Sequence, residues 1–229
     1  MSFKDIFNID GEVKESAHAR VNLIGEHTDY TGGYVMPTLL SFKNTIEISQ
    51  NNSNEFTVYS QHFKEKKTFN DLKKSTNNEW VDYIKGCLHI FFDENKISSR
   101  FLNIFIASDI PLERGISSSS ALCVATLKAL NTFFETKIKD PEIAKLAKKV
   151  EFNYIGVSGG IMDQMVSSIG IHGKAFFMNC KNLEYELINF PENWKFCLID
   201  SEVQRNLRDS SYNVRSVSYT HLRAHETEL

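Results

Sequence analysis

The sequence predicts an α+β domain in which helices cover a sheet. Strand-like runs dominate the first part of the chain, and helical patterns cluster later. The chain contains neither GxxxxGK(S/T) nor GxGxxG, so it indicates no P-loop and no dinucleotide-binding βαβ unit. A doubly wound parallel sheet is therefore not expected. At 229 residues, the chain can bury one large core or two small ones.

The early strands are predicted from short apolar or β-rich runs. Residues 21–24 are apolar and precede a polar, glycine-containing turn. Residues 45–49 and 56–59 are rich in β formers, and the polar segment 50–54 separates them. This arrangement predicts a hairpin with a polar loop.

Helical periodicity begins at Trp80 and continues to Phe92, which predicts an amphipathic helix. Residues 101–107 then form a β-rich run typical of a buried strand. After the loop 111–115, a serine cluster is expected to open a second helix that continues to Phe133.

A third helix is expected from Asp140 to Gly156. The sequence Asp-Pro-Glu at its start combines an N-cap side chain, a proline at the first position and an acid in the first turn. A fourth helix is expected after Gly160, and strand-like runs follow at 174–178, 185–190 and 196–200.

Composition excludes several function classes. A net charge of -3 and a pI near 6.2 give no electrostatic reason to expect nucleic acid or an anionic membrane as a partner. No window approaches the ~18 apolar residues of a membrane span, and the N-terminus lacks the apolar core of a secretory signal. Four cysteines without CxxC spacing predict free, buried thiols, so a cytoplasmic protein is expected.

The first chemical feature is a dense polar group just after a short strand. Arg20, Glu26, His27 and Asp29 lie within ten residues of each other. Carboxylates and imidazole can hold several sugar hydroxyls at fixed angles. A solvated turn with an ordinary exposed histidine is the alternative, and composition alone does not decide between them.

The second feature is PLERGISSSSAL, residues 111–122, a loop entering a helix N-terminus. Backbone N–H groups and the helix dipole there favour an anion, and serine hydroxyls add donors or a magnesium ligand. A serine-rich helix cap without a ligand is the alternative.

The third feature is SGGIMDQM, residues 158–165, where Asp163 stands among apolar residues at the start of a helix. A carboxylate in such a setting needs a partner or a task. Asp163 either complements the helix dipole or takes a proton from a substrate hydroxyl.

In this order, the three features resemble the galactokinases of the GHMP sugar kinase family. ARVNLIGEHTDYTGG (residues 19–33), the serine loop and GIMDQ are similar to its sugar, phosphate and catalytic motifs. WVDYIKG (80–86) and SSYNVR (210–215) fit as well. The resemblance implies a GHMP-kinase N-terminal domain, like domain 2 of ribosomal protein S5, over residues 1–184. It also implies the beginning of a ferredoxin-like C-terminal domain over 185–215.

The resemblance implies the phosphorylation of D-galactose at its anomeric carbon by ATP. Asp163 would act as the base and Arg20 would lie beside it, keeping it ionised. The sugar hydroxyls would be held by Glu26, His27, Asp29, Gly160 and Tyr212.

The resemblance also implies ATP and Mg²⁺ as cofactors. Backbone amides would cradle the phosphates, Trp80 would flank adenine, and Ser119 and Glu151 would hold magnesium. The phosphate loop comprises Gly115, Ser117, Ser118, Ser119 and Ser120. A related sugar-1-kinase (for N-acetylgalactosamine, galacturonate or arabinose), a non-catalytic galactose sensor and an inactive fragment are the alternatives, and a monomer is expected.

Four departures from the family pattern qualify this expectation. His18 and Ala19 stand where the family has Pro-Gly, and Glu113 replaces the first glycine of the phosphate loop. A carboxylate there would repel triphosphate, so weaker ATP binding or a rearranged loop is expected. Residues 216–229 resemble nothing in the family, and its third, glycine-rich motif is missing. A C-terminally truncated chain with a non-native tail is therefore expected.

Overall fold

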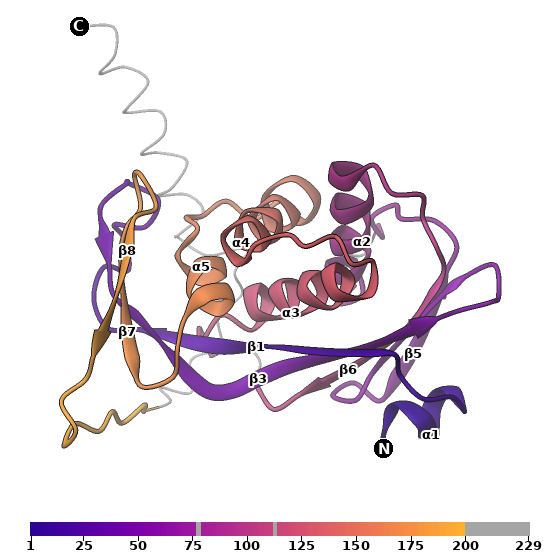
Figure 1. The fold of residues 1–229 in the computed structure, drawn as a ribbon, viewed down its shortest axis with the longest axis horizontal. Coiled ribbons are helices and arrows are strands. Elements are labelled where there is room, and N and C mark those ends of the chain that lie inside the picture. The colour runs from indigo at the N-terminus through magenta and orange to yellow at the C-terminus, as the bar shows by residue number, and fades with distance from the viewer. Residues whose placement is uncertain (77–78, 112–113, 200–229) are drawn as a thin grey trace, which may run out of the picture.

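The computed structural model describes residues 1–76, 79–111 and 114–199. Helices α2 to α5 cover one face of an eight-stranded sheet (Figure 1). The strands are β1 Val13–Asn22, β2 Tyr34–Val35, β3 Pro37–Gln50, β4 Phe56–Ser60, β5 Glu65–Phe69, β6 Leu102–Ser108, β7 Lys174–Asn179 and β8 Tyr185–Asn189. The helices are α1 Phe3–Phe7, α2 Asp82–Asn95, α3 Ser118–Phe133, α4 Asp140–Lys149, the π-helix η1 Val150–Ile155, and α5 Met162–Ile169.

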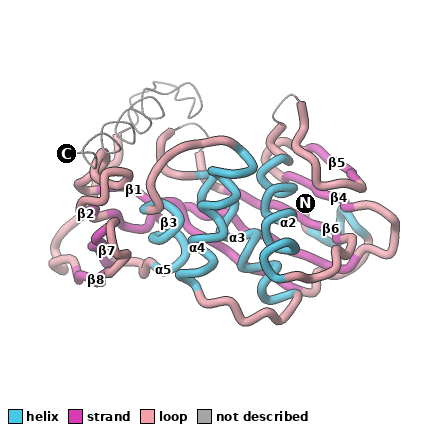
Figure 2. Tube along the Cα trace, turned by 90° about the horizontal axis from the view of Figure 1, so that it is seen from above, coloured by secondary structure: helices cyan, strands magenta, loops and turns pink. Residues whose placement is uncertain are grey.

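Central strands and facing helices form the main core. Ile46 and Ile48 of β3 and Ile104 of β6 are fully buried against Leu88 of α2 and Leu127 of α3. Seen from above, the helices lie across the sheet from α2, beside β4 and β6, to α5 near β7 (Figure 2). The expected α+β layer is confirmed.

The expected hairpin between residues 45–49 and 56–59 is wrong. β6 lies between β3 and β4, antiparallel to β3 and parallel to β4. β6 is buried from Leu102 to Ile106. Such a strand belongs in the interior of a sheet, where it has a neighbouring strand on each side. The polar segment 50–54 therefore connects two strands that do not pair with each other.

Several elements agree with their expected positions, with local corrections. The helix from Asp140 is confirmed, but its N-cap is Lys139, and its end, Val150–Ile155, is a π-helix. Residues 196–199 form no strand, and Cys197 is exposed rather than buried. In the described part of the chain, no helix is long and apolar enough to cross a membrane.

β8 extends the sheet beyond the expected domain boundary at residue 184. It pairs antiparallel with β7 along its whole length, from Tyr185 to Asn189. The boundaries at 184 and 215 stay predictions, because residues 200–229 lie outside the described residues.

Candidate active site

A register shift in the sheet places Arg20. The pairing of β1 with β3 slips between His18 and Arg20, so the Arg20 N–H leaves the ladder and donates to the carbonyl of Ile116 at 3.2 Å. Such irregularities re-aim side chains next to active sites. The serine loop is thereby joined to the strand at the residue whose side chain enters the site.

Arg20 and Asp163 form a two-pronged ion pair. Arg20 Nε donates to Asp163 Oδ1 at 2.6 Å, and Arg20 Nη2 donates to Oδ2 at 2.7 Å. Arg20 Nη1 donates to the Gly115 carbonyl at 3.0 Å, and Ser117 Oγ donates to Asp163 Oδ2 at 2.5 Å. A bidentate guanidinium fixes both charge and orientation. The catalytic candidate at the start of α5 is therefore held from β1 and from the serine loop.

Glu151 is the second carboxylate of the site. It is buried, with 5% of its surface exposed, and it lies in the π-helix η1. Ser119 and Ser120 each donate to it at 2.8 Å, and Gln164 Nε2 donates to Oε2. Burial raises the pKa of Glu151 above its ordinary value, although these three neutral donors oppose the rise. π-Helical turns often occur at functional sites.

Asp29 is the third carboxylate. The backbone N–H of Ile161 donates to its Oδ1 at 2.9 Å, and that of Met162 at 3.3 Å. Burial, and then the nearby charge of Asp163, raise the pKa of Asp29 to about 6. Gly160 packs directly on it, since a Cβ on Gly160 would lie 1.5 Å from Asp29 Oδ1.

Asp29→Asn is expected to stabilise the fold at neutral pH. Because the folded-state pKa lies above the unfolded one, the native state binds more protons between about pH 4 and pH 6, and Asp29 costs stability as the pH rises through this window. The variant's stability advantage should therefore grow by about 2 kcal/mol between about pH 4.5 and pH 7.5. Urea unfolding at both pH values measures this.

The exposed Asp93→Asn variant is the matched control for the removal of one carboxylate charge. An advantage of Asp29→Asn that stays constant over this pH range would contradict the raised pKa.

The other expected sugar contacts are less enclosed. Glu26 and His27 are exposed in the turn after β1, and the His27 ring nitrogen Nδ1 is 2.9 Å from the Tyr30 hydroxyl. Tyr212 and Glu113 lie outside the described residues. The structure therefore brings Asp29 close to Asp163 and Gly160 against Asp29, while Glu26 and His27 are exposed in their turn.

Trp80 has a separate environment just before α2. Its Nε1 donates to Glu65 Oε2 at 2.8 Å, and its ring stacks on Phe63 with centroids 5.6 Å apart. These contacts tie Trp80 to β5 and to the β4–β5 turn rather than to the serine loop.

Three site residues were not anticipated from the sequence. Gln164 donates to Glu151, Cys180 forms a side-chain hydrogen bond with Asp29, and Lys148 donates to the Gly159 carbonyl. Lys148 precedes Glu151 by three residues, and this spacing places both side chains on one side of a helix. The spacing is the sequence signal from which Lys148 could have been predicted as a site residue.

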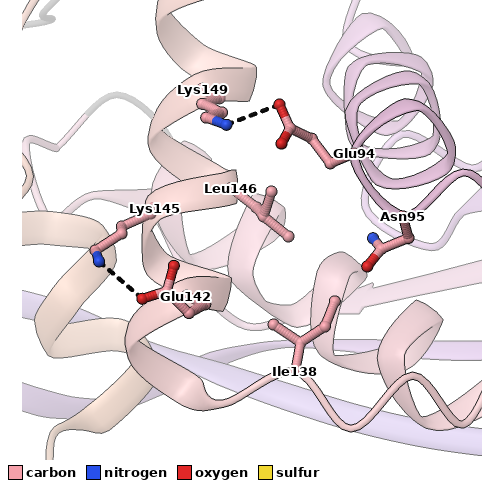
Figure 3. Close-up of a pocket in the computed structure, with 7 residues that line it drawn as sticks. All are labelled: Glu94, Asn95, Ile138, Glu142, Lys145, Leu146 and Lys149. Atoms are coloured by element: carbon pink, nitrogen blue, oxygen red, sulfur yellow. Dashed lines mark hydrogen bonds and ion pairs between the residues drawn. The ribbon is translucent and has the colours of Figure 1, made fainter.

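A hollow of about 230 Å³ lies elsewhere, between the end of α2 and α4 (Figure 3). Two ion pairs of 2.7 Å flank it, Lys149 with Glu94 and Lys145 with Glu142. Its lining is Glu94, Asn95, Ile138, Glu142, Lys145, Leu146 and Lys149. None of these residues belongs to the carboxylate cluster, so the hollow is not part of this site.

Comparison with known proteins identifies the family. The galactokinase galactose-binding signature matches residues 1–50, and the GHMP kinases N terminal domain matches residues 82–170. The chain belongs to the galactokinase family of GHMP kinases. Galactokinase of Pyrococcus furiosus is 38% identical over 197 residues, and that of Fusobacterium nucleatum is 34% identical over 223.

The match covers much more of this chain than of its galactokinase relatives. It covers 86% of this chain and 55% of the Pyrococcus protein, and 94% and 57% for the Fusobacterium protein. Lactococcus lactis galactokinase, solved in complex with galactose, superposes with a TM-score of 0.88 at 28% identity, covering 99% of this chain and 60% of that chain. The chain therefore spans little more than half the length of these galactokinases.

Proposed function

We propose that this chain carries the sugar-binding, phosphate-binding and catalytic elements of an ATP-dependent galactokinase. The single observation that carries the proposal is the joining of Arg20, Ser117 and Asp163 next to the buried Asp29. Asp163, which is paired with Arg20, can take a proton from a substrate hydroxyl, and the neighbouring Asp29 can hold the sugar that carries this hydroxyl. The galactose-binding signature over residues 1–50 supports D-galactose as that acceptor.

In the proposed site, Asp29 accepts hydrogen bonds from sugar hydroxyls in its ionised form. Glu26 and His27 close over the sugar from the exposed turn, and Gly160 leaves room for Asp29 beside α5. Tyr212 is a further proposed contact. Because a sugar presents hydroxyls in several directions, contacts from separate elements fix its orientation.

In the proposed reaction, the C1 hydroxyl oxygen attacks the γ-phosphorus of ATP. A new O–P bond forms, the bond from phosphorus to the β–γ bridging oxygen breaks, and ADP leaves. Asp163 holds the attacking hydroxyl and takes its proton, while Arg20 stabilises the charge that spreads over the phosphoryl oxygens.

The serine loop suits phosphate through its backbone. Gly115 and Ser117 have φ values of 72° and 63°, in the left-handed region, and such turns direct successive N–H groups toward an anion. Non-glycine residues such as Ser117 rarely adopt this backbone conformation, and those that do are often found at functional sites. Ser118 and Ser120, in the first turn of α3, complete the proposed phosphate site. We place the adenine ring beside Trp80.

Ser119 and Glu151 fit a magnesium ion. Both offer hard oxygen ligands, and the described donors to the buried Glu151 are all neutral, so its charge suits a divalent cation. When bound there, magnesium would supply positive charge against the phosphate oxygens. We further propose a monomeric cytoplasmic protein.

Galactose binding and ADP release test the proposal. We expect calorimetry to detect D-galactose binding to the 229-residue chain. We expect galactose-dependent ADP release from a version extended by the C-terminal part of a galactokinase relative. A panel with N-acetylgalactosamine, galacturonate and arabinose defines the sugar. Binding without ADP release from the extended version would indicate a sensor and contradict the kinase.

A further inference from the structure

A half-buried lysine stands among the three carboxylates of the site. Lys148, in the last turn of α4, lies within electrostatic reach of Asp29, Glu151 and Asp163. Burial lowers the pKa of Lys148 from its ordinary value, against the opposing effect of these acids. Lysine is almost never fully buried unless it is paired, and the half-buried Lys148 has acidic groups around it.

The ammonium group of Lys148 contacts the segment that shapes the sugar site. Its Nζ donates to the carbonyl of Gly159, and it lies 5.9 Å from the centre of the Phe152 ring. Two consecutive glycines, Gly159 and Gly160, give this segment wide conformational freedom. The contact from Lys148 restrains that freedom just before the two N–H groups that hold Asp29.

Charge balance gives Lys148 a second effect. Asp163 accepts two hydrogen bonds from the positively charged Arg20 side chain. Asp29, in contrast, accepts its two backbone hydrogen bonds from neutral N–H groups. Asp163 disfavours a charge on Asp29, and Lys148 favours it. Cys180 is the third group facing Asp29, and its thiol is neutral because burial raises its pKa to about 12.

We propose that Lys148 is a positioning residue of the sugar site. It fixes the Gly159–Gly160 segment against Asp29 and supplies the positive charge that keeps Asp29 ionised beside Asp163. The expected consequence of this role is tight binding of galactose near neutral pH, and that consequence rests on the proposed function.

Three substitutions separate the two effects. Lys148→Gln keeps an N–H donor for the Gly159 carbonyl but loses the charge, Lys148→Met loses both, and Lys148→Arg keeps both. Lys145→Gln is the matched control, since Lys145 lies on the same helix in an exposed pair with Glu142. Thermal unfolding verifies that each variant is folded.

The first measurement needs no ligand. Carboxyl-carbon NMR titration of Asp29, assigned with Asp29→Asn, should give a pKa near 6 in the parent and in Lys148→Arg. Lys148→Gln and Lys148→Met should raise this pKa by about one unit. Equal Asp29 pKa values in Lys148→Gln, Lys148→Met and Lys145→Gln would overturn the proposal.

The second measurement is galactose calorimetry against pH. Lys148→Gln should lose about threefold in affinity near pH 6.5 and recover above about pH 8, because Asp29 is again ionised there. Lys148→Met should show an additional loss that does not recover with pH. If both variants bind galactose as the parent does at every pH, Lys148 does not position this site. If the parent binds no galactose, the proposed function fails, while the NMR titration still decides the role of Lys148.

Discussion

Asp163→Asn is expected to reduce ADP release by about 1,000-fold or more while leaving galactose binding within a few-fold of the parent. Asparagine keeps the shape of the side chain, but it neither takes up the proton of the C1 hydroxyl nor balances the charge of Arg20. The proposed sugar contacts from Asp29 and the turn after β1 remain. Initial rates of the extended version and calorimetry with galactose measure the two effects separately.

The exposed Asp93→Asn variant, which changes a carboxylate far along the sequence on α2, serves as the control and should leave both quantities unchanged. Full turnover in Asp163→Asn would end the mechanism proposed for this site. Loss of galactose binding together with turnover would instead assign Asp163 to sugar recognition or to the fold.

Gly160→Ala is expected to weaken galactose binding by about 10- to 100-fold and to destabilise the fold by about 1–3 kcal/mol. The new Cβ would lie 1.5 Å from Oδ1 and 1.8 Å from Cγ of Asp29, so either the carboxylate or the Gly159–Gly160 segment must move. The backbone of Gly160 is not left-handed, so the expected cost comes from this collision rather than from φ. Urea unfolding and galactose calorimetry provide the two values.

A double-mutant cycle isolates the collision. In an Asp29→Ala background the clashing atoms are gone, so adding Gly160→Ala should cost less than about 0.5 kcal/mol of stability. An undiminished cost in that background would show that Asp29 is not what excludes a side chain at position 160.

Much of the site was predictable because its parts are contiguous in sequence. Residues 19–33, the serine loop and GIMDQ each carry their polar groups within a few positions, and the order of the three motifs identifies the family. Spacing alone could not pair Arg20 with Asp163, which are 143 residues apart, but the family resemblance predicted that they lie side by side. Sequence spacing alone likewise gave no reason to expect Ser119 and Ser120 on Glu151 or Gly160 against Asp29.

For the fold too, local features were predictable from the sequence and contacts between distant segments were not. Periodicity located α2 and β6 because each carries its pattern within one continuous segment. Strand partners follow no such local rule, which is why the hairpin expected across residues 50–54 was wrong. The π-helix η1 was also missed, because apolar spacing barely differs between an α turn and a π turn.

The sequence by itself determined the family and the α+β class, and it supplied the residues proposed for the site, because these follow from contiguous motifs and local periodicity. Beyond the pairing of Arg20 with Asp163 and the grouping of Ser119 with Glu151, which the resemblance implied, only the tertiary structure decided which groups meet. The register slip at Arg20, the serines on Glu151 and the lysine reaching Gly159 join distant elements. Packing places three carboxylates together, and the low polarity of that interior then raises the pKa of Asp29 to about 6, which no sequence pattern encodes.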